Sequence, residues 1–136
     1  MSDKILGRDE ILAADDHELI DVEVPEWGGT VLVKPLTGDE RDQYESSNWR
    51  RDPKGGMQLD TRGARARLAQ MCLVDESGKR LFSKEDVRKL GAKSSHALDR
   101  VTEVARTASG ISDDYVEDAV EDFDEDEAAG VASSYV

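Results

Sequence analysis

The sequence is poor in the residues that build covalent and metal-linked frameworks. Cys72 is the single cysteine among 136 residues, so the chain can form no internal disulfide and holds no CxxC pair. Neither His17 nor His96 is spaced with a second histidine or cysteine as metal ligands are, and we expect no metal site. Cys72 falls on an apolar helical stripe, which predicts a buried structural thiol and not a nucleophile.

Aromatic residues and long apolar runs are also scarce. Aromatics make up 5% and hydrophobic residues 38% of the chain, which predicts a modest, mainly aliphatic core. No apolar run approaches the roughly 20 residues that span a bilayer, and the N-terminus lacks the apolar centre of a signal peptide. Gly28-Gly29 and Gly55-Gly56 match neither common phosphate-binding loop. We therefore expect a cytoplasmic protein that is not an enzyme and carries no cofactor.

Basic residues are missing from the C-terminal end. No Lys or Arg follows Arg106, while residues 107–136 carry ten Asp and Glu, and the preceding 106 residues hold 21 acids against 18 bases. This distribution predicts a small α+β domain at 1–110, a marginal acidic helix at 111–123 and a disordered acidic tail at 124–136. Such a tail repels nucleic acid and anionic membranes, and it favours basic protein partners or simply solubility.

The stretch VPEWGGTVLVKP carries the strongest strand pattern. Apolar and polar residues alternate on both sides of Gly28-Gly29, which predicts an antiparallel hairpin with a two-residue turn. That register sets Val24 opposite Val33, although a loop of four residues also fits. One face then carries Ile20, Val22, Val24, Val31 and Val33. The other face carries Pro25, Trp27 and Leu32, which are core if a helix covers them and a docking site for another protein if none does.

The rest of the chain reads as short helices and turns. A capping box at Thr37-x-x-Glu40 starts one helix, and a weaker one at Ser83-x-x-Asp86 starts another that ends at Gly91. The remaining elements are a short helix at 7–16, a loop at 49–60, a helix at 61–72, a tight hairpin at 73–82, a helix from Ser94 or Ser95 to Gly110, and an acidic helix at 113–123. Small antiparallel hairpins packed with about four to five short helices define an α+β fold.

Residues 50–67 form a basic segment with a net charge of +4 beside Trp49. Three interpretations fit this composition: a nucleic-acid contact, a contact for the acidic tail, or a solvated loop. The overall charge of −13 disfavours nucleic acid.

Three stretches together resemble a known family. They are ILAADD, VEVPEWGGTVLVKPLTGDERD and LVDESGKRLFSKEDVRKLGAKSSHALDRV, which span most of residues 5–110. They resemble the small tail assembly chaperones of long-tailed bacteriophages, especially those that infect actinobacteria. The middle loop and the tail beyond Phe123 lie outside this resemblance.

The resemblance implies a role in assembly. Members of that family bind the tape measure protein, keep it soluble and help tail tube protein subunits assemble around it. They act in the host cell cytoplasm and are absent from the mature virion. Many exist in a second, longer form made by programmed frameshifting, and some self-associate. The family fold is mixed α and β.

Two further classes of function remain open. One is an acidic inhibitor or DNA mimic that binds a basic partner, and the other is a minor structural connector protein of the virion. For each of these functions, the sequence predicts a protein partner and no binding to nucleic acid or to membranes. The candidate partner-binding residues are Trp27, Leu32, Pro25, Tyr115, Val116, Val120 and Phe123.

Overall fold

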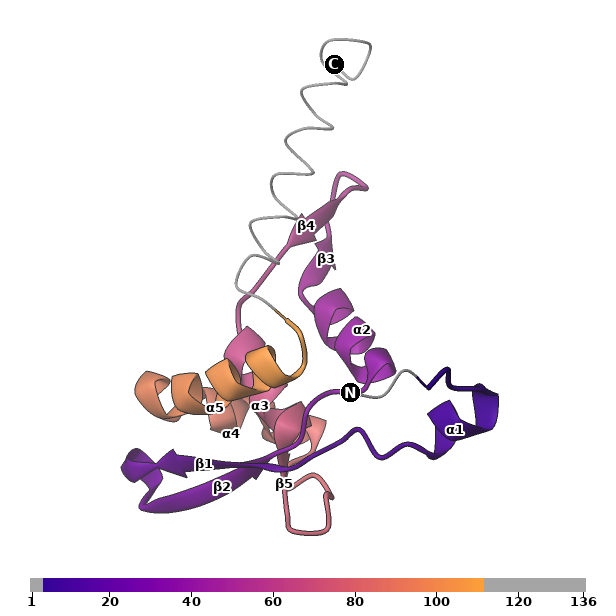
Figure 1. Cartoon of the computed structure of the whole chain (residues 1–136). Helices are drawn as coiled ribbons and strands as arrows, with labels where there is room; N and C mark the ends of the chain where they lie inside the picture. The colour runs from indigo at the N-terminus through magenta and orange to yellow at the C-terminus, as the bar shows by residue number, and fades with distance from the viewer. Residues whose placement is uncertain (1–3, 112–136) are drawn as a thin grey trace.

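A computed structural model describes residues 4–111, which form an α+β fold with two antiparallel sheets (Figure 1). The predicted fold class is therefore confirmed. The first sheet has the order β1-β2-β5, and the second pairs β3 with β4. The helices and strands are α1 (Arg8–Ala13), β1 (Ile20–Val24), η1 (Pro25–Trp27), β2 (Gly29–Val33), α2 (Gly38–Ser47), β3 (Trp49–Arg51), β4 (Met57–Leu59), α3 (Ala64–Cys72), β5 (Leu73–Val74), η2 (Lys84–Asp86), α4 (Val87–Gly91) and α5 (Ser95–Ala108).

The hairpin of β1 and β2 has a different register from the predicted one. Val24 lies opposite Gly29, and Ile20 lies opposite Val33. The reason is local: Pro25 starts a 3-10 turn, and Gly28 closes that turn in the left-handed region at a φ of 76°. The turn therefore takes four residues and not two, which corrects the two-residue Gly28-Gly29 turn. Because this slip is an even number of residues, every strand side chain keeps its predicted face.

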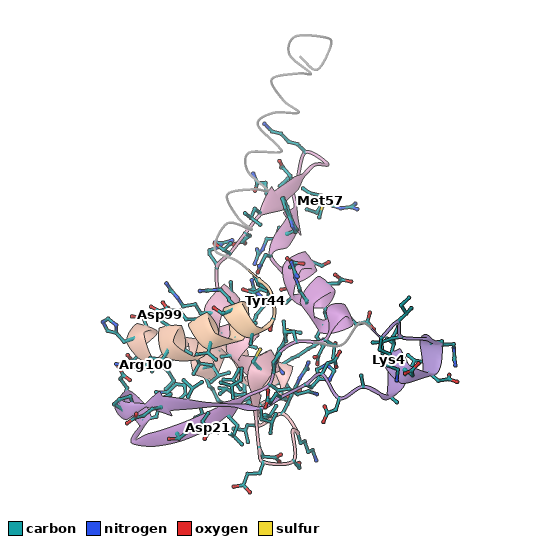
Figure 2. All side chains as sticks on the ribbon, viewed as in Figure 1. Lys4, Asp21, Tyr44, Met57, Asp99 and Arg100 are labelled. Atoms are coloured by element: carbon teal, nitrogen blue, oxygen red, sulfur yellow. The ribbon has the colours of Figure 1, made fainter. Side chains whose placement is uncertain are left out.

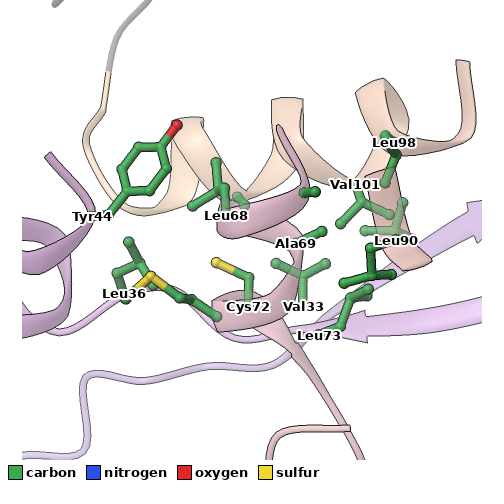
Figure 3. Packing of buried hydrophobic residues seen from close by; sticks show 14 of the residues in the cluster. Val33, Leu36, Tyr44, Leu68, Ala69, Cys72, Leu73, Leu90, Leu98 and Val101 are labelled. Carbon is green, nitrogen blue, oxygen red and sulfur yellow. The ribbon is translucent and has the colours of Figure 1, made fainter. Parts of the chain in front are cut away.

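The core lies between the valine face of this sheet and the helices α3 and α5, with α4 packed beside α3 (Figures 1 and 3). Val24 and Val33 are fully buried from the sheet, as are Leu68 from α3 and Val101 from α5. The core is aliphatic as expected, and Tyr44 is the one aromatic side chain that is buried among residues 4–111. Burial of this apolar surface is the main stabilising contribution to the fold.

Several expected turns and caps are present. The Glu40 amide donates to Thr37 Oγ1 at 3.1 Å and the Thr37 amide donates to Glu40 Oε1 at 2.9 Å, so the capping box of α2 is confirmed. Ser94 caps α5, whose chain then turns at Gly110 with a φ of 74°. The predicted helix does end at Gly91, but Gly91 is the last residue of α4 and has no positive φ, so it is not the left-handed glycine that often follows a helix.

The segments 49–60 and 73–82, predicted as a loop and as a tight hairpin, both contribute strands to the sheets. The predicted loop at 49–60 contains the β3–β4 hairpin, whose turn is closed by a bond from the Asp52 amide to the Gly56 carbonyl oxygen at 2.7 Å. The predicted second hairpin at 73–82 is present, with Val74 bridged to Arg80, and Leu73 and Val74 also pair with β2 as a third strand. The sequence of a short polar segment does not indicate such pairing, because strand formation there depends on contacts with the neighbouring strand.

The N-terminal helix α1 stands apart from the body of the protein (Figure 1), and none of its residues is buried. Across residues 4–111, no helix is both long enough and apolar enough to cross a membrane. The predicted acidic helix and tail lie outside the described residues.

Candidate partner-binding surfaces

The sheet has an outer face that points away from α3 and α5. Strand pairing places Asp21, Leu32 and Val74 in one row across the three strands, and directly paired residues share a face. Figure 2 shows Asp21 on the side of the sheet away from the helices. This row is the floor of a groove of about 920 Å³, which we call the sheet groove.

The sheet groove combines apolar and acidic side chains. Its apolar part includes Leu32, which is partly exposed, and Leu81, which is 52% exposed. Asp21, Asp75 and Glu76 also line it, whereas no Lys or Arg of the described part of the chain does. A surface of this composition suits an apolar segment flanked by basic residues, because the carboxylates repel acidic segments and attract basic ones.

The loop after β5 shapes one wall of the sheet groove. Asp75 Oδ1 accepts hydrogen bonds from the Ser77 hydroxyl at 2.6 Å and the Ser77 amide at 2.8 Å, and Gly78 takes the left-handed conformation at a φ of 86°. These bonds, with one from the Lys79 amide, hold the pKa of Asp75 below its ordinary value. Asp75 therefore stays ionised and keeps the loop folded beside Leu81.

The predicted partner-binding residues separate in space. Leu32 lies in the sheet groove, whereas Trp27 is partly buried and packs against the core. Pro25 is exposed at the hairpin tip. The shared outer face predicted for Trp27 and Leu32 is wrong, because the 3-10 turn ends the alternation of the strand before Trp27. Tyr115, Val116, Val120 and Phe123 lie outside the described residues.

Trp27 is partly buried because the turn that carries it lies against helix α5. The 3-10 turn packs against α5, and Arg100 of that helix donates from Nε to Glu26 at 2.8 Å. The hydrogen bond and charge of Arg100 lower the pKa of Glu26. The hairpin tip is thereby attached to the helical layer. The sequence offers no such signal, since Glu26 and Arg100 are 74 residues apart.

A second apolar surface lies on the N-terminal segment. Ile5, Leu6, Ile11 and Leu12 are all more than half exposed, Ile5 at 93%. The sequence predicted an apolar edge on this short helix at Ile11 and Leu12, and the structure leaves that edge uncovered. Leu81 and the N-terminal pair Ile5 and Leu6 were missed, since single apolar residues in polar surroundings give no periodic signal.

Three of the six basic residues in the segment 50–67 are paired with carboxylates within residues 4–111. Arg50 and Arg62 both pair with Asp60, at 2.7 and 2.9 Å, and Arg65 pairs with Asp99 at 2.7 Å. The hydrogen bonds from Arg62 and the charges around Asp60 hold its pKa far below the ordinary value. Arg67 donates to Asn48 Oδ1 at 2.6 Å. Arg67 thereby joins α3 to the end of α2, and Arg65 joins α3 to α5, so these two arginines have structural partners.

The single cysteine and the two histidines are the side chains best suited to nucleophilic catalysis or metal binding. Cys72 is fully buried, and burial raises the pKa of its thiol to about 12, as expected of a structural cysteine. His17 lies beside Asp16, with its Nδ1 at 3.2 Å from Asp16 Oδ1, and His96 is exposed in the first turn of α5. Within residues 4–111, no three His, Cys, Asp or Glu side chains are grouped as metal ligands.

Known proteins give no match to this chain: no protein-family model, no curated protein and no solved structure matches it. The choice of a function therefore depends on the surfaces described above.

Proposed function

We propose that this protein is a tail assembly chaperone of a long-tailed bacteriophage. It binds the tape measure protein in the host cell cytoplasm, keeps it soluble and promotes assembly of the tail tube around it. The observation that carries this proposal is the sheet groove, in which Leu32 and Leu81 are accessible beside three carboxylates. The resemblance of residues 5–110 to that family supplies the particular client.

The sheet groove suits a helical client. A helix with an apolar stripe can lay that stripe against Leu32 and Leu81, while Lys or Arg beside the stripe meet Asp21 and Glu76. Each such contact is small and therefore weak. Many chaperone copies along one long client would retain it through avidity, and tube subunits would displace them by competing for the same stripe.

The N-terminal segment offers a second contact. Of its four exposed apolar residues, Ile5 and Leu6 precede helix α1 and Ile11 and Leu12 lie within it, and the linker 14–18 follows the helix. A segment of this kind can close over a client that lies in the sheet groove, because a chain of about six residues reaches roughly 20 Å. The acidic overall charge of −13 keeps the resulting complex soluble.

Co-expression with the tape measure protein of the same phage genome tests the proposal. We expect wild-type protein to raise the soluble fraction of the tape measure protein, and Leu81→Asp to abolish this effect. Losing the burial of one leucine costs about 1.5–3 kcal/mol, which weakens each contact by about tenfold to a hundredfold.

Met57→Asp is the matched control. Met57 is 54% exposed, against 52% for Leu81, but it lies on the β3–β4 hairpin far from the sheet groove (Figure 2). It should solubilise the client like wild type. Equal solubilisation by Leu81→Asp and Met57→Asp would exclude the sheet groove as the binding surface.

Two further measurements separate the rival functions. Mass spectrometry of purified virions should not find this protein, whereas a connector protein would be present in every particle. A DNA mimic would lose its activity when residues 112–136 are deleted, since they hold ten of the 31 acidic residues. The chaperone proposed here keeps its sheet groove, and therefore its client, after the same deletion.

A further inference from the structure

A second concave surface lies on the opposite side of the molecule from the sheet groove. It is a cleft of about 470 Å³ among α2, α3 and α5, and we call it the helix cleft. Tyr44, Ala66 and Leu98 contribute its buried apolar part, and Figure 3 shows Tyr44 and Leu68 lying between these helices. None of the predicted partner-binding residues within 4–111 lines this cleft.

The helix cleft is basic. Arg65, Lys93 and Arg106 line it, and among residues 4–111 no Asp or Glu does. Arg65 has a partner in Asp99 at the edge, at 2.7 Å. Lys93 makes no ion pair with any of the residues 4–111 that the structure describes. The cleft therefore favours an acidic occupant that also has apolar side chains for its floor.

The chain itself leaves the fold at this cleft. Ile111 is buried and is part of the lining, and its amide donates to the Arg106 carbonyl oxygen at 2.8 Å. The next 25 residues hold ten carboxylates and no Lys or Arg. Asp113 and Asp114 follow within about 7–10 Å of Ile111 even in a fully extended chain. Tethering on this scale gives an effective concentration on the order of millimolar or more.

We propose that residues 112–123 dock into the helix cleft of their own chain. Asp113 or Asp114 pairs with Lys93, and Tyr115 or Val116 covers the apolar floor. The acidic segment then stays on the helical side of the molecule and leaves the sheet groove open. This inference depends on the cleft and on the charge order of the chain, and it is independent of the proposed chaperone function.

Zero-length carbodiimide cross-linking of the full chain, mapped by mass spectrometry, tests this docking. We expect the dominant product to join Lys93 to Asp113, Asp114 or Glu117, and high salt to reduce its yield several-fold. Lys54 and Lys79 are the controls, because both are exposed and lie on other surfaces. Acidic residues joined to all three lysines in equal yield would overturn the proposal.

A mixture of isotope-labelled and unlabelled chains distinguishes the source of the acidic segment. Docking within one chain gives cross-links that join only like-labelled peptides. Mixed-label products as the main species would show that the cleft takes the segment of a second copy, and they would refute docking in the same chain.

A charge exchange provides an independent readout. Amide hydrogen exchange in residues 112–123 should be at least several-fold faster in Lys93→Glu than in wild type, and Lys93→Glu with Asp113→Lys should restore the slower rate. Exchange at the rate of an unstructured peptide in the wild-type chain would contradict docking. Lys54→Glu, a charge reversal away from the cleft, should leave the rate unchanged.

Discussion

Replacing Trp27 with alanine tests whether this side chain is part of the core or part of a docking surface. Trp27 is partly buried, packs against the core and belongs to the turn that contacts α5. Full truncation of a buried tryptophan costs about 3–5 kcal/mol. Since part of Trp27 is exposed, we expect Trp27→Ala to lower the free energy of unfolding by about 2–3 kcal/mol, which corresponds to roughly 100 Å² of lost apolar burial.

Thermal unfolding followed by far-ultraviolet circular dichroism measures this loss. For a domain of this size, about 2 kcal/mol lowers Tm by roughly 8–16 °C. Client solubilisation per folded molecule should stay at the wild-type level, because Trp27 lies outside the sheet groove. Trp27→Phe should lose less stability than Trp27→Ala because it keeps an aromatic ring in the same space.

The opposite pattern would refute this reasoning. If Trp27→Ala unfolds at the wild-type temperature and fails to keep the client soluble, then Trp27 acts at an interface, as its position in the sequence suggested. Leu81→Asp provides the complementary pattern, in which binding is lost and stability is kept. The two variants together separate the contribution of the core from that of the groove.

Three further predictions concern single positions. Gly28→Ala should lower the free energy of unfolding, measured by urea titration, by about 1–2 kcal/mol because alanine disfavours the left-handed conformation. Gly29→Ala should be neutral in the same titration, since Gly29 has no positive φ and no described atom lies within 4 Å of an added Cβ. Cys72 should resist alkylation at neutral pH in the native protein and react fully in denaturant, because burial raises the pKa of its thiol to about 12. The pKa of Asp60 in the folded protein lies below its unfolded value of about 3.9. Its ion pairs therefore stabilise the β3–β4 hairpin fully above a pH of about 3.9, and this stabilisation is lost as the pH falls toward the folded-state pKa. Hydrogen exchange of the hairpin amides should therefore stay slow from neutral pH down to about 4, and Asp60→Asn should speed it throughout that range.

Local sequence patterns predicted most of the elements correctly. The capping box at Thr37 and Glu40 fixes the start of α2 through bonds between residues three apart, so no distant residue is needed. Leu98, Val101 and Ala105 stand at helical spacing in the sequence, and they form part of the buried face of α5. The alternation of β1 and β2 assigned each strand residue to its face, and the assignment survived a wrong register because the slip was even.

The candidate site was predicted less well. Leu32 was placed correctly on the outer face by its alternation with Val31 and Val33. Leu81 and Glu76 were not found, because they reach the sheet groove only through the turn after β5 and the pairing of β5 with β2. Trp27 was assigned to the same surface as Leu32, since nothing in the sequence shows that α5 returns to cover the hairpin tip.

The sequence by itself determined the aliphatic character of the core, the faces of the strands, the capping box that starts α2 and the separation of acidic from balanced segments. These follow from charge and from interactions over a few residues. The tertiary structure alone decided which surfaces stay open. Contacts such as Glu26 with Arg100 and Leu32 with Val74 join segments more than 40 residues apart. They cover Trp27 and leave Leu32 and Leu81 accessible, because exposure depends on what packs over a residue and not on the residue itself.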